Sequence, residues 1–154
     1  MKSAEYLSKS QEETIKLGSR LAHVLKSGDI ICLFGELGSG KTTFTKGIAK
    51  GLKIDEKTVN SPTFVLMNEY EGRVPLFHFD LYRIEKADEV LGLGYEEFFY
   101  DQGVSVIEWA DRLGTLLPKE YLKIHFANSS KQKRLIHFHA AGERAKEIIG
   151  HLKL

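Results

Sequence analysis

The eight residues from 35 to 42 constrain this chain more than any other stretch, because they read Gly-Glu-Leu-Gly-Ser-Gly-Lys-Thr. An unbroken apolar run, residues 30–34, comes directly before them. Phe44, Ile48 and Leu52 follow at helical spacing. A glycine-rich loop between a buried strand and an amphipathic helix is the setting in which proteins bind phosphate groups. These residues therefore predict a phosphate-binding loop at a strand-to-helix turn.

Each part of this loop has a physical role. Gly35, Gly38 and Gly40 permit backbone conformations that a side chain would forbid, so successive N–H groups can turn inward around a phosphate. Lys41 is placed to reach the β and γ oxygens, and the Thr42 hydroxyl to ligate Mg²⁺. The helix that starts near Gly40 adds the positive end of its dipole. We expect a nucleoside triphosphate to be bound by Gly35, Glu36, Leu37, Gly38, Ser39, Gly40, Lys41 and Thr42.

Composition sets broad limits on the class of protein. A length of 154 residues with 42% hydrophobic content suits a single domain, residues 1–154, with a real core. The net charge of +1 gives no reason to expect strong non-specific binding to nucleic acid. Acidic residues dominate from 80 to 101 and basic residues from 119 onward. We interpret these segments as solvated surface, with a docking surface for a protein or tRNA as the alternative.

The cysteine content and the apolar segments indicate the compartment. Cys32 lies inside the apolar run, which predicts a buried thiol that packs as a small hydrophobe. No stretch reaches the length needed to span a bilayer, so we expect no membrane association. A reducing, cytoplasmic setting follows as the expectation.

Periodicity predicts the remaining elements. Helices are expected at residues 11–27, from about 40 to 52, at 87–91, at 95–100 and at 143–152, with Gly28 ending the first. Strands are expected at 30–34, 64–70, 74–81, 104–107, 121–127 and 135–140, with hairpins linking 64–70 to 74–81 and 121–127 to 135–140. This order predicts an α/β fold, a three-layer P-loop NTPase architecture with a mixed, mostly parallel central sheet.

Two carboxylates end predicted strands, where ligands of such sheets gather. In residues 77–80, alternation places His78 and Asp80 on one strand face, and Asp80 at the strand end. Glu108 follows the apolar strand 104–107, the usual form of a metal-binding strand beside a phosphate loop, and is the stronger candidate. An ordinary salt-bridged or surface acid is the alternative for each. Thr63, after a Ser-Pro turn, is either a nucleotide-sensing residue or the start of a strand.

Histidines raise a separate hypothesis. His137 and His139 share a strand face, and His125 is expected on a neighbouring strand. A zinc site usually needs three or four ligands, and no matching cysteine or acidic pattern lies nearby. The pattern therefore gives little support for zinc.

Four motifs together resemble those of one family. They are Gly-Glu-Leu-Gly-Ser-Gly-Lys-Thr-Thr at 35–43, Ser-Pro-Thr-Phe at 61–64, His-Phe-Asp-Leu-Tyr-Arg at 78–83 and Ile-Glu-Trp at 107–109. In order and spacing they are similar to the TsaE (YjeE-type) family of P-loop ATPases in tRNA threonylcarbamoyladenosine biosynthesis. The resemblance implies ATP or ADP and Mg²⁺ as cofactors. It implies TsaD-like and TsaB-like proteins as partners, with tRNA reached indirectly through their complex.

The resemblance also implies roles for residues of this chain. Lys41 would bind phosphates, Thr42 and Glu108 would serve Mg²⁺, and Asp80 would place metal or water. Lys41, Asp80 and Glu108 are thus the expected catalytic residues, with Thr42, Asp80 and Glu108 at the metal. Thr63 would belong to a switch-like segment, and Thr43 would touch the α-phosphate. Gln11 and Lys133 would border the nucleotide. Which carboxylate orients the attacking water stays open.

Other functions remain as alternatives to an ATPase. Small-molecule P-loop kinases have similar lengths, but they usually carry an arginine-rich lid, and no clustered arginines occur here. A GTPase is disfavoured because the chain has no Asn-Lys-x-Asp motif. A non-catalytic module, in which the nucleotide only organises a surface for partners, also fits the motifs.

Overall fold

The computed structural model describes residues 2–62, 65–92, 94–99, 102–128, 130, 133–152 and 154. In chain order the elements are β1 (Ser3–Ser8), α1 (Gln11–Ala22), β2 (Ile30–Gly35), α2 (Lys41–Gly51), η1 (Glu56–Thr58), β3 (Met67–Tyr70), β4 (Leu76–Asp80), α3 (Asp88–Leu91), α4 (Tyr95–Phe99), β5 (Val104–Glu108), η2 (Ala110–Leu116), β6 (Tyr121–Asn128), β7 (Arg134–Ala141) and α5 (Glu143–His151).

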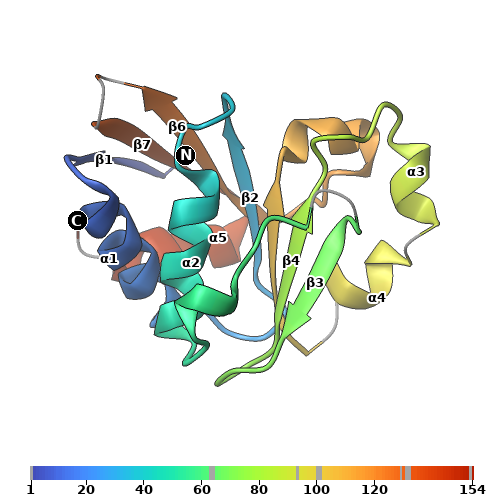
Figure 1. Cartoon of the computed structure of the whole chain (residues 1–154), viewed down its shortest axis with the longest axis horizontal. Helices are drawn as coiled ribbons and strands as arrows, with labels where there is room; N and C mark the ends of the chain where they lie inside the picture. The colour runs from blue at the N-terminus through green and yellow to red at the C-terminus, as the bar shows by residue number, and fades with distance from the viewer. Residues whose placement is uncertain are drawn as a thin grey trace.

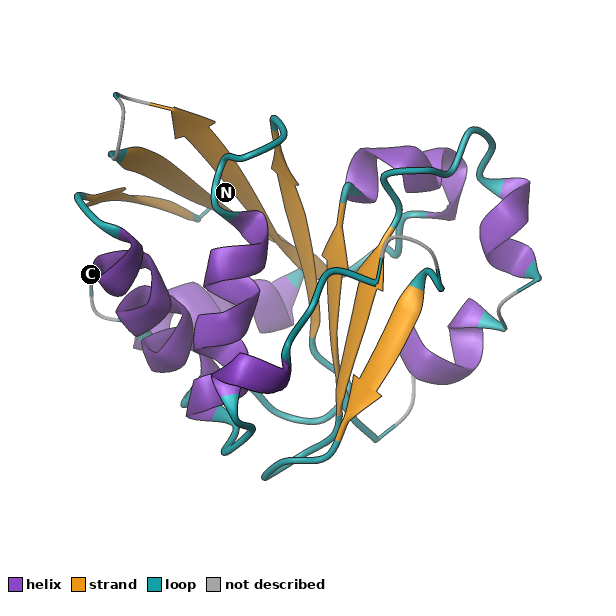
Figure 2. Cartoon of the chain, viewed as in Figure 1, coloured by secondary structure: helices purple, strands orange, loops and turns teal. Residues whose placement is uncertain are grey.

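The described strands form one mixed sheet in the order β1-β7-β6-β2-β5-β4-β3. The central strands β6, β2, β5 and β4 run parallel, whereas β1, β7 and β3 pair antiparallel with their neighbours. Helices flank the sheet on both sides (Figure 2). The predicted three-layer α/β fold with a mixed central sheet is confirmed.

The core has two parts, one on each face of the sheet, and β2 contributes to both. Its side chains alternate, so Ile31 and Leu33 face the helices α1, α2 and α5, while Ile30 and Cys32 face α3, α4 and η2. Figure 1 shows α1 and α2 on one side of the sheet and α3 and α4 on the other. Burial on both faces explains the unbroken apolar run of this strand.

Cys32 is buried, as the sequence predicted, and its burial raises the pKa of the thiol. None of the helices in the described ranges has both the length and the apolar composition that crossing a bilayer requires.

The first helix is shorter than predicted, ending at Ala22 rather than near residue 27. Side chains bind the backbone at this helix end, where Arg73 donates to the Ala22 carbonyl oxygen at 2.9 Å. The Val24 carbonyl accepts a hydrogen bond from Arg144 at 2.8 Å, and the Lys26 N–H donates to Asp29 at 2.7 Å. These partners take up the Val24 carbonyl and the Lys26 N–H, while the N–H groups of residues 23–25 bond three residues back in a tighter final turn.

The strand β1 was not predicted. It pairs antiparallel with β7 from Ser3 opposite His139 to Ser8 opposite Arg134. Only Ala4 and Tyr6 of this edge strand pack against the core, so its apolar alternation is weak in the sequence. The observed β3 begins at Met67, and the predicted start of that strand, Phe64, lies outside the described residues.

Candidate functional site

The loop between β2 and α2 has the backbone that a phosphate cradle needs. Gly35, Gly38 and Gly40 have φ angles of 147°, 77° and 107°, in the region that favours glycine. A Cβ on Gly35 would also lie 2.8 Å from the Phe126 carbonyl oxygen of β6. Gly40 is the N-cap of α2, and no side chain within the described ranges caps it. The first N–H groups of α2 therefore point to the loop without a side-chain acceptor.

Lys41 extends its ammonium group back into this loop. Its Nζ donates to the carbonyl oxygens of Gly35 at 2.7 Å and Glu36 at 2.8 Å, and lies 4.1 Å from the centre of the Trp109 ring. Burial lowers the pKa of Lys41, and the charges of Glu108 and other acids oppose this shift. The loop thus holds a cation where phosphate oxygens would need one.

Two carboxylates lie at the same edge of the sheet. Asp80 ends β4 and Glu108 ends β5, and they are opposite one another in the parallel register. Both are buried, with 3% and 2% of their surface exposed. Parallel strands bring their carboxyl ends together, so this pairing follows from topology. The prediction that His78 and Asp80 share one face of β4 is confirmed. Phe77 and Phe79 point to the opposite face, where they pack in the part of the core that faces α3, α4 and η2.

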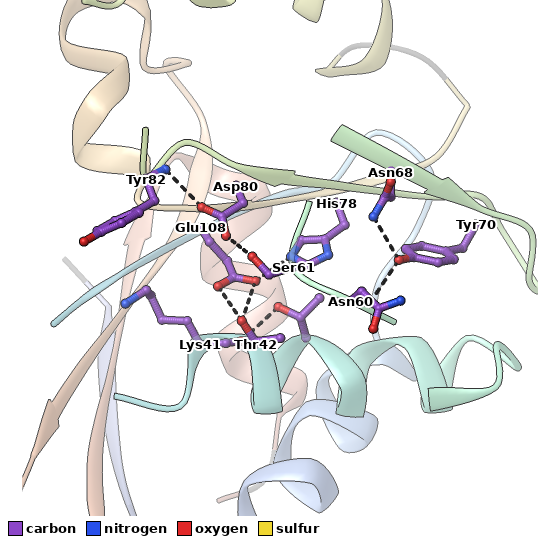
Figure 3. Close-up of polar contacts among 11 residues, drawn as sticks. Lys41, Thr42, Asn60, Ser61, Asn68, Tyr70, His78, Asp80, Tyr82 and Glu108 are labelled. Carbon is purple, nitrogen blue, oxygen red and sulfur yellow. Dashed lines mark hydrogen bonds and ion pairs between the residues drawn. The ribbon is translucent and has the colours of Figure 1, made fainter. Parts of the chain in front are cut away.

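The Glu108 carboxylate connects the sheet to α2. Thr42 donates from Oγ1 to Glu108 Oε1 at 2.9 Å, and His78 Nε2 lies 2.5 Å from Glu108 Oε2 (Figure 3). Asp80 instead accepts from the Tyr82 N–H at 3.0 Å and from the Ser61 hydroxyl. The two acids therefore have different partners: Glu108 faces the first turn of α2, and Asp80 faces the turn at Ser61.

A cleft of about 400 Å³ opens over these groups. This volume falls in the range of small-molecule sites, about 300–1,000 Å³. Residues 37–43 of the loop and α2 line it together with Ser61, Asp80, Tyr82, Glu108 and Trp109. The rest of the lining is Ser10, which caps α1, Gln11 and Thr14 of α1, and Arg134 of β7. The cleft thus brings together segments from both ends of the chain.

The cleft contains most of the predicted residues. Gln11, Thr42 and Thr43 line it, whereas Gly35 and Glu36 are not lining residues and accept hydrogen bonds from Lys41 through their carbonyl oxygens. Thr63, which was predicted to belong to a nucleotide-sensing segment, lies outside the described residues.

At the late basic turn, the residue beside the loop is Arg134 rather than Lys133. The Arg134 guanidinium donates to the Gly38 carbonyl at 3.2 Å, while Lys133 is exposed and is not among the lining residues. Neighbouring residues at the start of a strand point to opposite sides, so only one of the two can face the loop.

Sequence reasoning missed several lining residues. Ser61 lies in the motif at 61–64 and Tyr82 in the motif at 78–83, so these motifs could have indicated that both residues lie near the site. Trp109 lies in the Ile-Glu-Trp motif; it packs against the core and also lines the cleft, where the centre of its ring lies 4.9 Å from that of Tyr82. Arg134 carried no local signal, because its position depends on the pairing of β7 with β6.

The three histidines that β6 and β7 carry do not form a metal site. His125, His137 and His139 lie side by side, with ring centres 6.2 and 6.3 Å apart. Across the described ranges, no three histidine, cysteine or acidic side chains are arranged to hold a metal ion. His125 is exposed, but partial desolvation lowers its pKa, and the positive charges of neighbouring groups lower it further.

Comparison with known proteins gives consistent matches. The family model of threonylcarbamoyl adenosine biosynthesis protein TsaE matches residues 8–136. A Bacillus subtilis (strain 168) protein named tRNA threonylcarbamoyladenosine biosynthesis protein TsaE is 44% identical over 145 residues, which cover 94% of this chain and 90% of that protein. A protein of the same name from Nostoc sp. is 45% identical over 119 residues, covering 74% of this chain and 72% of its own.

A solved structure matches as well. The crystal structure of Bacillus subtilis YdiB has a TM-score of 0.84 and 37% sequence identity to this chain, covering 98% of it and 94% of YdiB. The similarity in sequence and in fold therefore extends over most of the chain, and the resemblance drawn from the four motifs is confirmed.

Proposed function

Because this chain belongs to the TsaE family and has a role in tRNA threonylcarbamoyladenosine biosynthesis, we propose that it binds ATP with Mg²⁺ in the cleft and hydrolyses the ATP. One observation carries the proposal: Lys41, Thr42, Asp80 and Glu108 gather at the N-terminus of α2. Phosphoryl transfer requires neutralised charge, a placed metal ion and an oriented nucleophile. This group offers a candidate for each requirement.

The donor set fits Mg²⁺, which prefers oxygen ligands and usually keeps several waters. Thr42 and Glu108 would hold the ion, and Asp80 would contact it through water. When bound, Mg²⁺ would neutralise charge on the β and γ phosphates. No acidic residue occupies the first turn of α2, so the positive end of this helix is available to an anion.

The surroundings of the two acids support a division of roles. Glu108 is bound to Thr42, a metal-ligand position, and we assign Glu108 to the metal. Asp80 is bound to Ser61, whose turn leads into the switch-like segment, and we assign Asp80 to the attacking water. Lys41 would exchange the carbonyl oxygens of Gly35 and Glu36 for phosphate oxygens. The loop amides would bind the remaining phosphate oxygens.

We propose that hydrolysis is slow in the isolated chain and faster with TsaD-like and TsaB-like partners. Among described lining residues the cations are Lys41 and Arg134, and Arg134 is hydrogen-bonded to Gly38. A cation supplied by a partner would stabilise the charge of the transition state. Apolar side chains at the rim also fit a partner, because Leu37 is 69% and Tyr82 42% exposed. Contact with tRNA would then be indirect, through the complex.

The exposed side chains at the edge of the cleft also fit a second candidate function, a nucleotide-dependent binding module that does not hydrolyse ATP. Such a module would use the loop to organise the exposed apolar side chains Leu37 and Tyr82 for a partner. It shares the nucleotide site with the ATPase and differs only in the fate of the bound ATP.

The deciding experiment is phosphate release from MgATP, with and without purified TsaD-like and TsaB-like proteins. Stimulation by the partners supports the ATPase, and stable nucleotide-dependent complexes without turnover support the binding module. Phosphate transfer to a metabolite without release to water supports the kinase. Lys41→Ala is the control, because it removes the loop cation and should abolish nucleotide binding. Unchanged binding by a folded Lys41→Ala variant contradicts the assignment of this loop.

A further inference from the structure

A buried histidine lies beside the predicted metal ligand Glu108. His78 is on β4, two residues before Asp80, and its side chain is 0% exposed. Its Nε2 lies 2.5 Å from Glu108 Oε2, while Thr42 contacts Oε1 of the same carboxylate at 2.9 Å (Figure 3). We propose that His78 is a positioning residue that holds the Glu108 carboxylate toward Thr42 and Mg²⁺, an inference that rests on the proposed function.

The contacts of His78 determine which ring nitrogen carries the proton. An ionised carboxylate only accepts hydrogen bonds, so Nε2 donates to Glu108. Within the described residues, the buried Nδ1 has no partner. The hydrogen bond to Glu108 therefore requires a proton on Nε2.

This arrangement restricts a flexible side chain. Glu108 has three rotatable side-chain bonds, and a carboxylate without a fixed partner would sample several orientations. The His78 N–H holds Oε2, and the Thr42 hydroxyl lies 2.9 Å from Oε1 and 3.2 Å from Oε2, so the carboxylate is fixed between these two residues. Partners that orient metal ligands in this way typically change metal affinity or activity by about 10–100-fold when removed. A histidine that only filled the core would have no such effect on the metal.

Two substitutions separate the position of the donor from the bulk of the ring. In His78→Gln, the amide nitrogen is as many bonds from Cβ as the ring Nε2 is, so it can reach Glu108. In His78→Asn, the amide nitrogen is one bond closer to Cβ and corresponds to Nδ1. Both variants lose the ring and differ from each other by one methylene, so their stabilities are measured by urea unfolding to account for packing. His125→Asn serves as a matched control, because His125 is an exposed histidine outside the cleft.

The readout is Mn²⁺ binding to the protein–ADP complex, followed by electron paramagnetic resonance. We expect His78→Asn to weaken Mn²⁺ binding about tenfold or more, and His78→Gln to stay within about threefold of the parent. ADP binding without metal should be equal in all variants. Parental Mn²⁺ affinity in His78→Asn, or an equal loss in both variants, overturns the inference. A parent complex that binds no Mn²⁺ overturns the proposed function and this inference with it.

The unsubstituted protein provides a second test that needs no variant to fold. Long-range ¹H–¹⁵N spectra distinguish the two nitrogens of a histidine ring. We expect the His78 signal of a protonated Nε2. The opposite tautomer would contradict the hydrogen bond to Glu108 and overturn the inference.

Discussion

Replacing Gly47 by alanine tests how closely α1 and α2 must pack. A Cβ at Gly47 would lie 2.2 Å from the Ile15 carbonyl oxygen of α1, and a Cβ at Gly18 would lie 2.5 Å from the Phe44 carbonyl oxygen of α2. The two helices thus meet through their backbones. A backbone oxygen cannot rotate away as a side chain can, so the helices must separate by about 1 Å to restore ordinary contact.

The expected cost combines two opposing effects. Overpacking typically destabilises by about 1–3 kcal/mol, and the upper value applies because the obstacle is backbone. The higher helix propensity of alanine recovers about 1 kcal/mol. The net destabilisation is therefore about 2 kcal/mol, which lowers the melting temperature of a chain of this size by about 4–8 °C. Nucleotide binding should also weaken, because Gln11 and Thr14 of α1 line the cleft opposite Lys41 and Thr42 of α2.

The assay is urea and thermal unfolding followed by circular dichroism, with nucleotide affinity measured by calorimetry. Gly150→Ala in α5 is the matched control, because its added Cβ meets only the flexible Lys2 ammonium, at 2.9 Å. The control should range from neutral to about 1 kcal/mol more stable than the parent. A Gly47→Ala variant that is as stable as the parent, or more stable, refutes the argument from close backbone contact.

Three further predictions concern charges. Glu108→Ala or Asp80→Ala should spare much of the nucleotide binding but cut hydrolysis, and a parental phosphate-release rate in the presence of partners would contradict the role of the substituted acid. Arg144→Met should destabilise by about 3 kcal/mol in urea unfolding, because Asp29, with 4% of its side chain exposed, loses its 2.8 Å partner; adding Asp29→Asn should recover much of this loss. Burial lowers the folded-state pKa of Lys41 below its ordinary 10.5, so the unfolded chain binds this proton more tightly than the folded chain does. As pH rises from the folded-state pKa to 10.5, the stability of the parent should therefore rise relative to that of Lys41→Met. A difference in melting temperature between the two proteins that stays constant over this pH range contradicts the prediction.

Much of the fold was predictable because its signals are local. The apolar run before the glycine loop predicted β2, and the spacing of Phe44, Ile48 and Leu52 predicted α2. The hairpin of β6 and β7 followed from alternation around a polar turn, and that of β3 and β4 from two strand-like segments joined by a short turn at 71–73. The strand β1 was missed because it is an edge strand that depends on β7, far away in the sequence. The end of α1 was misplaced because Arg144, from the last helix, binds the Val24 carbonyl.

The candidate site likewise contains residues that local motifs identified and contacts that depend on the sheet order. The loop residues and the two strand-end acids were identifiable from the chain, because their chemistry lies in short motifs. Their partners were not: the contact of His78 with Glu108 requires β4 and β5 to be neighbours, and the contact of Arg134 with Gly38 requires the sheet order. No pattern within either motif specifies these pairs.

By itself, the sequence determined that this protein has a phosphate loop after a buried strand, because glycine positions and side-chain periodicity act over a few residues. Only the tertiary structure decided which side chains complete the cleft around that loop. Gln11, Asp80, Glu108 and Arg134 meet there because strand order and register bring distant segments to one edge of the sheet. Such long-range pairing depends on the whole core, and no local stretch encodes it.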